Sequence, residues 1–491
     1  METGGSGLRI VTLMLLFGWS SGCFPGTIIY PIRYADRSID LGISADELNV
    51  PTGKCADTTS NDLSLILPRS CAPHRLYSGF VASDRVTCLS LRDNLIERVS
   101  IGSFDHLPNL RYLDLSKNRI EFCDLLSFGG NDRLITLIVD ENGTPGEGDG
   151  GSMIDRSSHF PRVEHLYLRG NRLRQLRFSL RRNFPSLTHL YLSDNLLGSE
   201  SIDDSELPIS LRHLHLERNR IRRLDSRIVR DLHFLFLDGN EIGTVCATNC
   251  RGSFVDLRGA TKLRFLSLAR NEIAHIDRDS FVDACNLRSL SLSHNRIESV
   301  AAGTFDWLRE LWDLSLSHNR LRHVPSFNFA RKLASLTLDH NEIERIEPSA
   351  FGALTRLKWI TLSGNRIRAI ETGAFRDLEM LEELDLSDNE LSYLAPAWIG
   401  SNTRLRLLDL RGNRFTSFDH LYLHDVVSLT DLYMQGNPLS SFAPPPFGTF
   451  SRHVNLHTEY GITHSPRPCY VICNFDSHAL SRSTQTADYW I

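Results

Sequence analysis

Residues 287–295 read LRSLSLSHN, and residues 311–319, one step of 24 further on, read LWDLSLSHN. Both follow the pattern L-x-x-L-x-L-x-x-N, in which leucines alternate with variable residues before an asparagine. This alternation has the period of a β-strand, so the leucines lie on one face of a short strand. A single such strand cannot bury that face, whereas parallel copies stacked about 4.8 Å apart bury a continuous row of leucines.

The pattern recurs fifteen times, and most steps between its asparagines are 24 residues. The asparagines stand at positions 94, 118, 142, 171, 195, 219, 240, 271, 295, 319, 341, 365, 389, 413 and 437. An asparagine amide both donates and accepts hydrogen bonds, so it suits the point where the chain leaves each strand. A phenylalanine recurs on the return path, and we interpret these residues as a buried spine: Phe104, Phe281, Phe305, Phe351 and Phe375.

This pattern resembles the leucine-rich repeat family over residues 86–439. The resemblance implies an α/β solenoid: a leucine-rich repeat horseshoe of about 15 repeats, with a parallel sheet on its concave face. The array is similar to extracellular members such as Slit, Toll ectodomains and the acid-labile subunit, and to soluble leucine-rich immune proteins of arthropods. That similarity implies protein ligands, with immune, pathogen-surface and cell-surface partners as alternatives, and a role in innate immunity as one of them.

The ends of the chain point to secretion. Arg9 precedes the apolar stretch 10–19, and small residues precede Cys23, as in a secretory signal peptide. We therefore expect a signal peptide over 1–22, an N-terminal flank over 23–85, the repeat array over 86–439 and a C-terminal flank over 440–491. No later run approaches the ~20 apolar residues of a membrane span. The alternative is an adhesion or receptor ectodomain that lacks its membrane segment.

Ten cysteines fit disulfide-stapled ends in an oxidising compartment. We expect local disulfides between Cys246 and Cys250 and between Cys469 and Cys473. His464 and His478 flank the second pair with a loose zinc-like spacing, but secretion favours the disulfide there. Two further cysteines, Cys123 and Cys285, lie inside the array, where a buried free thiol is the alternative to a disulfide.

Two steps of the array carry insertions. The step from Asn142 to Asn171 is 29 residues long and is rich in glycine, which indicates a loop. Asn142-Gly143-Thr144 also fits an N-glycosylation acceptor, and the irregular loop leads us to predict a glycan at Asn142. The step from Asn240 to Asn271 is 31 residues long and contains Cys246 and Cys250.

Composition and motifs argue against several functions. The chain has 54 basic and 59 acidic residues, a net charge of -5 that favours neither nucleic acid nor anionic membranes. Gly146, Gly148 and Gly151 fit G-x-G-x-x-G, yet Glu147 and Asp149 would repel a pyrophosphate. The sequence has no P-loop, H-E-x-x-H or EF-hand motif. We therefore expect a non-catalytic protein without a cofactor.

The residues between the leucines face outward from the concave sheet, and repeats four to eight present aromatic rings there. The set is His165, Tyr167, His189, Tyr191, His213, His215, Phe234, Phe236 and Phe265. We predict that these rings form an exposed, ligand-binding patch, so that Tyr191→Ala with Phe236→Ala abolishes binding and leaves stability nearly unchanged. The alternatives are that a flank covers the patch, or that β-propensity alone selects these residues.

Further along the array the same columns become hydroxylic and then acidic. The hydroxyl strip comprises Ser289, Ser291, Ser315, Ser335, Thr337 and Thr361, edged by His294, His318 and His340. The acidic residues are Asp313, Glu383, Asp385, Asp409 and Asp431. A basic partner is one interpretation and a solvated face is the favoured one. The stacked imidazoles at His165, His189 and His213 also suggest a pH sensor or a metal site, but ordinary polar contacts explain them, and we expect no metal.

Overall fold

The computed structural model describes residues 63–143, 158–439 and 454–464, apart from 68, 70–71, 122–123, 130, 177, 203–205, 249, 402, 424–425 and 459–460. The predicted signal peptide, the glycine-rich loop and the Cys469–Cys473 pair lie outside these residues. The chain forms two compact units, Met1–Ser291 and Leu292–Ile491. Within the described residues, no helix combines the length and the apolar character needed to cross a membrane.

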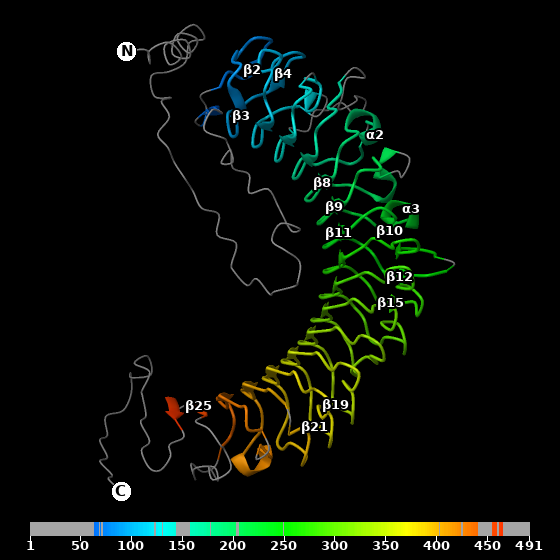
Figure 1. Cartoon of the computed structure of the whole chain (residues 1–491), viewed down its shortest axis with the longest axis vertical. Helices are drawn as coiled ribbons and strands as arrows, with labels where there is room; N and C mark the ends of the chain where they lie inside the picture. Colours follow the sequence, from blue (N-terminus) through cyan, green and yellow to red (C-terminus); the bar gives the residue numbers. More distant parts are fainter. Residues whose placement is uncertain are drawn as a thin grey trace, which may run out of the picture. The chain divides into compact units, whose positions relative to one another are not determined.

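The first unit is a stack of short parallel strands, visible from blue to green in Figure 1. They are β1 (Leu63–Ile66), β3 (Val86–Ser90), β5 (Tyr112–Asp114), β6 (Thr136–Ile138), β7 (His165–Tyr167), β8 (His189–Tyr191), β9 (His213–His215), β11 (Phe234–Phe236), β14 (Phe265–Ser267) and β16 (Ser289–Ser291). Leucine pairs with leucine along the stack, as in Leu166↔Leu190↔Leu214. Strand β1 extends the sheet into the predicted N-terminal flank, where the sequence carries no repeat pattern.

The second unit repeats this arrangement. Its strands are β17 (Asp313–Ser315), β18 (Ser335–Thr337), β20 (Trp359–Thr361), β22 (Glu383–Asp385), β23 (Leu407–Asp409), β24 (Asp431–Tyr433), β25 (Asn455–Thr458) and β26 (Gly461–His464). All neighbours are parallel except β25 and β26, which form an antiparallel pair. Each of the fifteen sequence repeats therefore supplies one strand, which confirms the predicted parallel-sheet solenoid.

The return segments contain little helix in the described residues. Helical turns occur at α2 (Leu180–Asn183), η2 (Ser199–Ser201), α3 (Ser226–Val229) and η4 (Phe418–Leu421). Short parallel strands form β2 (Arg75–Leu76) with β4 (Arg98–Val99), β19 (Arg345–Ile346) with β21 (Ala369–Ile370), and the order β10 (Arg223–Leu224), β13 (Phe254–Asp256), β12 (Thr244–Cys246), β15 (His275–Ile276). The 31-residue step supplies β12 and β13, and a disulfide joins Cys246 to Cys250 beside them.

Leucines and phenylalanines make two parallel rows of core residues. The leucines of the repeat motif are fully buried, as at Leu113 and Leu115. The phenylalanine spine is also buried, with ring centroids 5.3 Å apart between Phe104 and Phe128 and 5.1 Å apart between Phe351 and Phe375. The predicted spine is therefore confirmed as core. These rings, edge to face at Phe104 and stacked at Phe351, fill the space between the return segments.

The motif asparagines form a hydrogen-bonded ladder. Asn118 Oδ1 accepts from the backbone N–H groups of Asn94 and Ile96, at 2.9 and 3.0 Å. Its Nδ2 donates to the carbonyl oxygens of Leu91 and Leu115, at 2.9 and 2.8 Å. Each amide thereby satisfies buried backbone groups of its own repeat and of the preceding one.

We expect Asn389→Ala to lower the free energy of unfolding of the second unit by about 1–3 kcal/mol. Asn389 Oδ1 accepts from Ile367 N at 3.0 Å, and its Nδ2 donates to Leu362 O and Leu386 O at 2.9 and 3.0 Å. Alanine leaves these buried groups without partners. Urea denaturation followed by tryptophan fluorescence measures the loss, and the exposed substitution Glu347→Ala serves as the control. A loss below 0.5 kcal/mol, the range of ordinary surface substitutions, would contradict the ladder's energetic role.

The residue before each ladder asparagine has a left-handed backbone. Its φ lies between +52° and +71° in all fifteen repeats, from Asp93 to Gly436. This conformation favours glycine and disfavours β-branched side chains. The turn directs these side chains along the edge of the sheet, so the edge carries a second column of residues next to the strands.

Two residues singled out from the sequence, Asn142 and Cys285, have definite environments. Asn142 is buried, and its Nδ2, the atom that a glycan would take, donates to Leu115 O, Val139 O and Asp140 O. These bonds argue against glycosylation of Asn142 in the folded chain. Cys285 is a free, exposed thiol, which corrects both the buried-thiol and the disulfide interpretations.

Candidate functional site

The nine aromatic residues singled out from the sequence all lie on the strands of the first unit. Strands β7, β8, β9 and β11 each contribute two rings, one from the first strand residue and one from the third. We call the first column, His165, His189, His213 and Phe234, the first ladder. We call the second column, Tyr167, Tyr191, His215 and Phe236, the second ladder. Phe265 of β14 stands at the end of both.

The rings of the first ladder stack face to face. Centroid distances are 4.2 Å from His165 to His189, 3.9 Å from His189 to His213 and 4.3 Å from His213 to Phe234. The strand spacing of ~4.8 Å imposes this stacking, because equivalent residues of neighbouring parallel strands lie side by side. The imidazole Nδ1 of His189 is 2.8 Å from Thr188 Oγ1, which fixes the orientation of the ring.

The second ladder continues the same geometry. Centroid distances are 4.1 Å from Tyr167 to Tyr191, 4.4 Å from Tyr191 to His215 and 4.1 Å from His215 to Phe236. Phe265 lies 4.7 Å from Phe236 and closes the column. The structure therefore brings all nine predicted residues into one continuous array of rings.

The burial of the array corrects one expectation. Tyr167, Tyr191 and Phe234 are only 2, 3 and 3 % exposed, so they are core residues rather than members of an exposed patch. Tyr191 also packs with Ile138 in a hydrophobic cluster. The three histidines of the first ladder, together with His215, Phe236 and Phe265, are half-buried. These six residues can therefore contact a ligand.

Charged residues that sequence reasoning missed flank the second ladder. Arg169 lies over the rings of Tyr167 and Tyr191, and its Nε donates to Asp140 Oδ2 at 2.9 Å. Glu217 accepts from Ser193 Oγ at 2.6 Å and lies 3.2 Å from His215 Nδ1. These residues occupy the position directly after the last leucine of each motif. That position was available in the sequence as a third outward-facing column.

The histidines of the first ladder, His165, His189 and His213, have lowered pKa values and are uncharged at neutral pH. Burial, followed by the neighbouring histidines, lowers the pKa of His189 to about 2 and that of His213 to about 3. Burial alone would raise the pKa of Glu217, but the hydrogen bond and charge of His215 and the Ser193 hydroxyl lower it below its usual range. An aromatic surface with a paired charged rim suits apolar and aromatic groups of a partner.

In the second unit, several residues of the hydroxyl strip and several of the acidic residues have hydrogen-bond partners within the protein. Thr337 Oγ1 donates to Ser315 Oγ at 2.8 Å and accepts from Ser317 Oγ at 2.9 Å. The carboxylate of Asp409 accepts from Arg411 Nε at 2.8 Å. Asp385 accepts from the amide and hydroxyl of Ser387. These internal partners reduce the acidic charge offered to a basic ligand and favour the interpretation of a solvated face.

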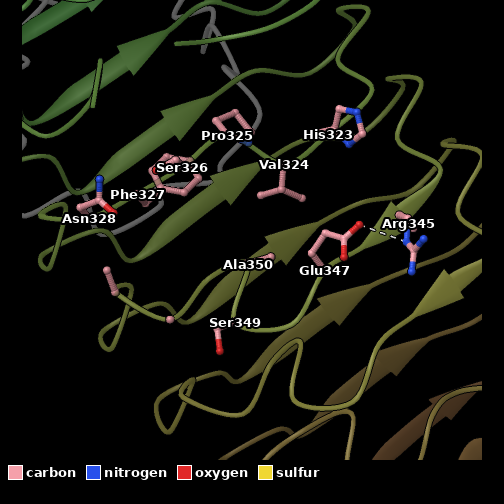
Figure 2. A pocket seen from close by; sticks show the side chains of 12 residues that line it. His323, Val324, Pro325, Ser326, Phe327, Asn328, Arg345, Glu347, Ser349 and Ala350 are labelled. Carbon is pink, nitrogen blue, oxygen red and sulfur yellow. Dashed lines mark ion pairs between the residues drawn. The ribbon is translucent and has the colours of Figure 1, made fainter. Parts of the chain in front are cut away.

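A cavity of about 500 Å³ opens on the return segments of the second unit, as Figure 2 shows. Its lining includes Val324, Pro325, Phe327, Arg345 and Glu347. Arg345 and Glu347 pair with each other at 3.1 Å, so the charged groups of the wall are satisfied within the protein. The cavity carries no repeat signal in the sequence, and its polar lining residues also include His323, Ser326 and Asn328.

Known proteins share this architecture. A family model described as "Leucine rich repeat" matches residues 84–143, 261–321, 331–391 and 381–439. A leucine-rich repeat protein of Leptospira interrogans is 23 % identical over 73 % of this chain and 92 % of its own, with a TM-score of 0.53. An internalin of Listeria monocytogenes is 21 % identical over 66 % of this chain and 86 % of its own, with a TM-score of 0.48. A chain of the mouse RP105/MD-1 complex is 21 % identical over 74 % of this chain and 69 % of its own, with a TM-score of 0.49. No curated protein sequence matches the chain significantly.

Proposed function

Since this chain belongs to the leucine-rich repeat proteins, which generally mediate protein–protein recognition, we propose that it is a secreted, non-catalytic recognition protein. Its ligand is a protein, and the exposed parts of the two ladders are the contact surface. The observation that carries this proposal is the continuous stack of rings from His165 to Phe265, of which six are half-buried.

The chemistry of the ladders favours a protein ligand. Aromatic and imidazole rings held rigidly by strand stacking offer contact area at little cost in conformational entropy. Rings are enriched among the residues that dominate protein interfaces, and the paired Asp140–Arg169 and Glu217–His215 groups supply a polar rim. An immune or pathogen-surface ligand is the finer form of this proposal, and an adhesion or receptor ectodomain is its alternative.

A photo-cross-linking experiment tests the contact surface. p-Benzoylphenylalanine replaces Phe265 or Phe236, which already carry aromatic rings, in the full-length chain. The protein is irradiated in extracellular fluid of its source, and cross-linked peptides are identified by mass spectrometry. We expect discrete protein adducts at both positions, and we expect His213→Ala in the Phe265 background to reduce them at least tenfold.

The matched control places the same photoreactive group at Ile209, which is 67 % exposed and lies outside the strands of the first unit. Circular dichroism establishes that each variant keeps the fold. Equal adducts at Ile209 and at the ladder positions, or adducts indifferent to His213→Ala, would show that the ladders are not the contact surface.

A further inference from the structure

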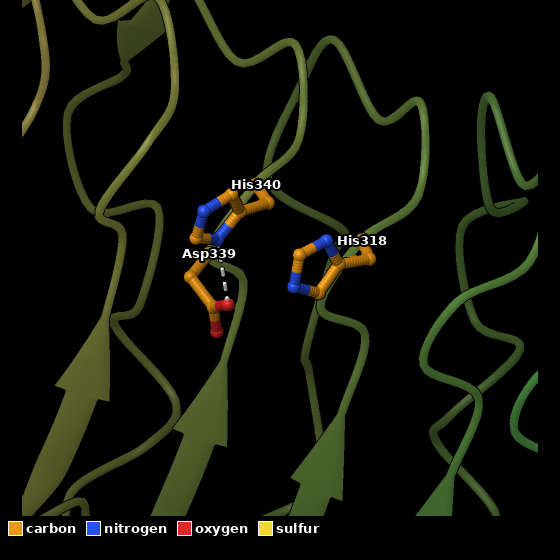
Figure 3. A group of neighbouring side chains, drawn as sticks. All are labelled: His318, Asp339 and His340. Atoms are coloured by element: carbon orange, nitrogen blue, oxygen red, sulfur yellow. Dashed lines mark hydrogen bonds and ion pairs between the residues drawn. The ribbon is translucent and has the colours of Figure 1, made fainter.

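The second unit contains a cluster of metal-binding side chains at the edge of its sheet, shown in Figure 3. His318, Asp339 and His340 come from the turns that follow β17 and β18. One ligand atom from each of the three lies within 4.8 Å of the others. We propose that these three residues bind a divalent transition-metal ion such as Zn²⁺.

The backbone holds the two histidines in register. Both occupy the left-handed position before a ladder asparagine, with φ of +54° at His318 and +53° at His340. The amide N of His318 donates to Asp339 O at 2.9 Å, which ties one turn to the next. The two rings stack with their centroids 4.2 Å apart and an interplanar angle of 15°. The site is thus built by the fold and needs only side-chain rotation to close.

Asp339 is oriented as a ligand. Its Oδ1 accepts from Ser317 Oγ at 2.6 Å and from Thr361 Oγ1 at 3.1 Å. Its Oδ2 faces His340 Nδ1 at 3.1 Å. Hydroxyls that fix a carboxylate in this way resemble the outer shell of established metal sites.

The contact between His340 and Asp339 shows where the ion would sit. The tautomer of His340 with a proton on Nδ1 donates that proton to Oδ2, and a metal ion takes the proton's place when the imidazole proton moves to Nε2. Two ligands of a tetrahedral zinc ion lie roughly 3.4 Å apart, given bond lengths of about 2.1 Å. The exposed imidazoles can rotate to reach that spacing. The ring of His340 packs against Gly364, where a larger residue would contact it.

The donor set selects the type of ion. Two imidazoles and one carboxylate suit Zn²⁺, Cu²⁺, Ni²⁺ and Co²⁺, whereas Ca²⁺ and Mg²⁺ prefer all-oxygen sets. Three protein ligands leave the fourth tetrahedral position to water. His294 stacks on the other face of His318 at 4.1 Å but is not part of the cluster around Asp339, which makes it the matched control.

Isothermal titration calorimetry of the full-length chain with ZnCl₂ tests the site. We expect the unaltered chain to bind one equivalent of Zn²⁺ at this site. His318→Ala and Asp339→Asn should each reduce the affinity by more than about 100-fold. Thr361→Val should weaken binding about 10-fold. His294→Ala, which removes a ring from the same stack, should change the affinity less than about threefold. MgCl₂ should give no heat of binding at this site.

A second readout guards against variants that fail to fold. Co²⁺ bound by two imidazoles and a carboxylate gives intense visible ligand-field bands in four-coordinate geometry, and these should vanish in Asp339→Asn while the circular dichroism spectrum is kept. Zinc affinity that is unchanged in both His318→Ala and Asp339→Asn would overturn the proposal. An equal loss in His294→Ala would also overturn it, because binding would then follow the histidine stack rather than the cluster at Asp339.

Discussion

Tyr191→Ala is expected to lower the free energy of unfolding of the first unit by about 3–5 kcal/mol, the range for truncating a buried aromatic residue. Tyr191 is 3 % exposed and lies between the rings of Tyr167 and His215. Its removal opens a gap in the second ladder and takes away one of the two rings beneath Arg169. The sequence alone predicted the reverse, namely little change in stability.

Urea denaturation followed by far-ultraviolet circular dichroism measures this loss. Tyr77→Ala is the control, because Tyr77 belongs to the same unit and is 59 % exposed, so its truncation should cost less than about 0.5 kcal/mol. Tryptophan fluorescence monitors the second unit separately, since four of the tryptophans, Trp307, Trp312, Trp359 and Trp398, lie in its described part. A cost for Tyr191→Ala as small as that for Tyr77→Ala would show that the ladder is a surface feature.

The second large effect concerns acid. Because the pKa values of His189 and His213 in the folded chain are lowered to about 2 and 3, the folded ladder resists protonation while the unfolded chain, with an ordinary value near 6.5, accepts it. Unfolded chains therefore bind more protons than folded chains between these values. Stability from these histidines is complete above about pH 6.5 and is lost progressively as the pH falls.

Other groups around the ladder set the pH range of the measurement. His165, His215 and His233 act on His213, and Glu217 lies beside His215. Carboxylates with ordinary pKa values are still mostly ionised at pH 5, so the groups that titrate between pH 7 and pH 5 are histidines and carboxyl groups such as Asp140 and Asp238, whose pKa values burial raises. We expect the thermal midpoint of the first unit to fall across this interval, and we expect His189→Gln with His213→Gln to flatten the fall.

The matched control is His275→Gln, which replaces an exposed histidine of the first unit outside both ladders. Its pH profile should follow that of the unaltered chain. A midpoint that falls equally in the double variant and in the unaltered chain would assign the acid sensitivity to other groups.

The sequence predicted the fold well because every repeat must bury the same residue types at the same positions. Leucine alternation, the asparagine amides and the phenylalanine spine each recur with one period, and each is buried or hydrogen-bonded as expected. The sheet also continues into β1 and β25, where the pattern is absent and pairing with a formed edge suffices. Strand pairing of that kind depends on the neighbour, so the segment's own sequence does not reveal it.

The sequence predicted which residues of the candidate site lie side by side, but not how deeply they are buried. Strand register follows from the repeat, so the adjacency of His189, His213 and Phe234 could be predicted from spacing alone. The depth of burial of Tyr167 and Tyr191 could not, because it depends on how neighbouring side chains pack. The cluster of His318, Asp339 and His340 combines residues from two turns, and only their conformations bring the nitrogen and oxygen atoms together.

The left-handed turn before each ladder asparagine limits what the edge of the sheet can display. Fifteen times the chain meets the same steric requirement, and at none of those positions does it carry valine, isoleucine or threonine. The residues found there are glycine or have unbranched stems, and several end in carboxylates, guanidinium groups or imidazoles. The residue types that vary along this edge are therefore few, and many of them carry groups that bind ions.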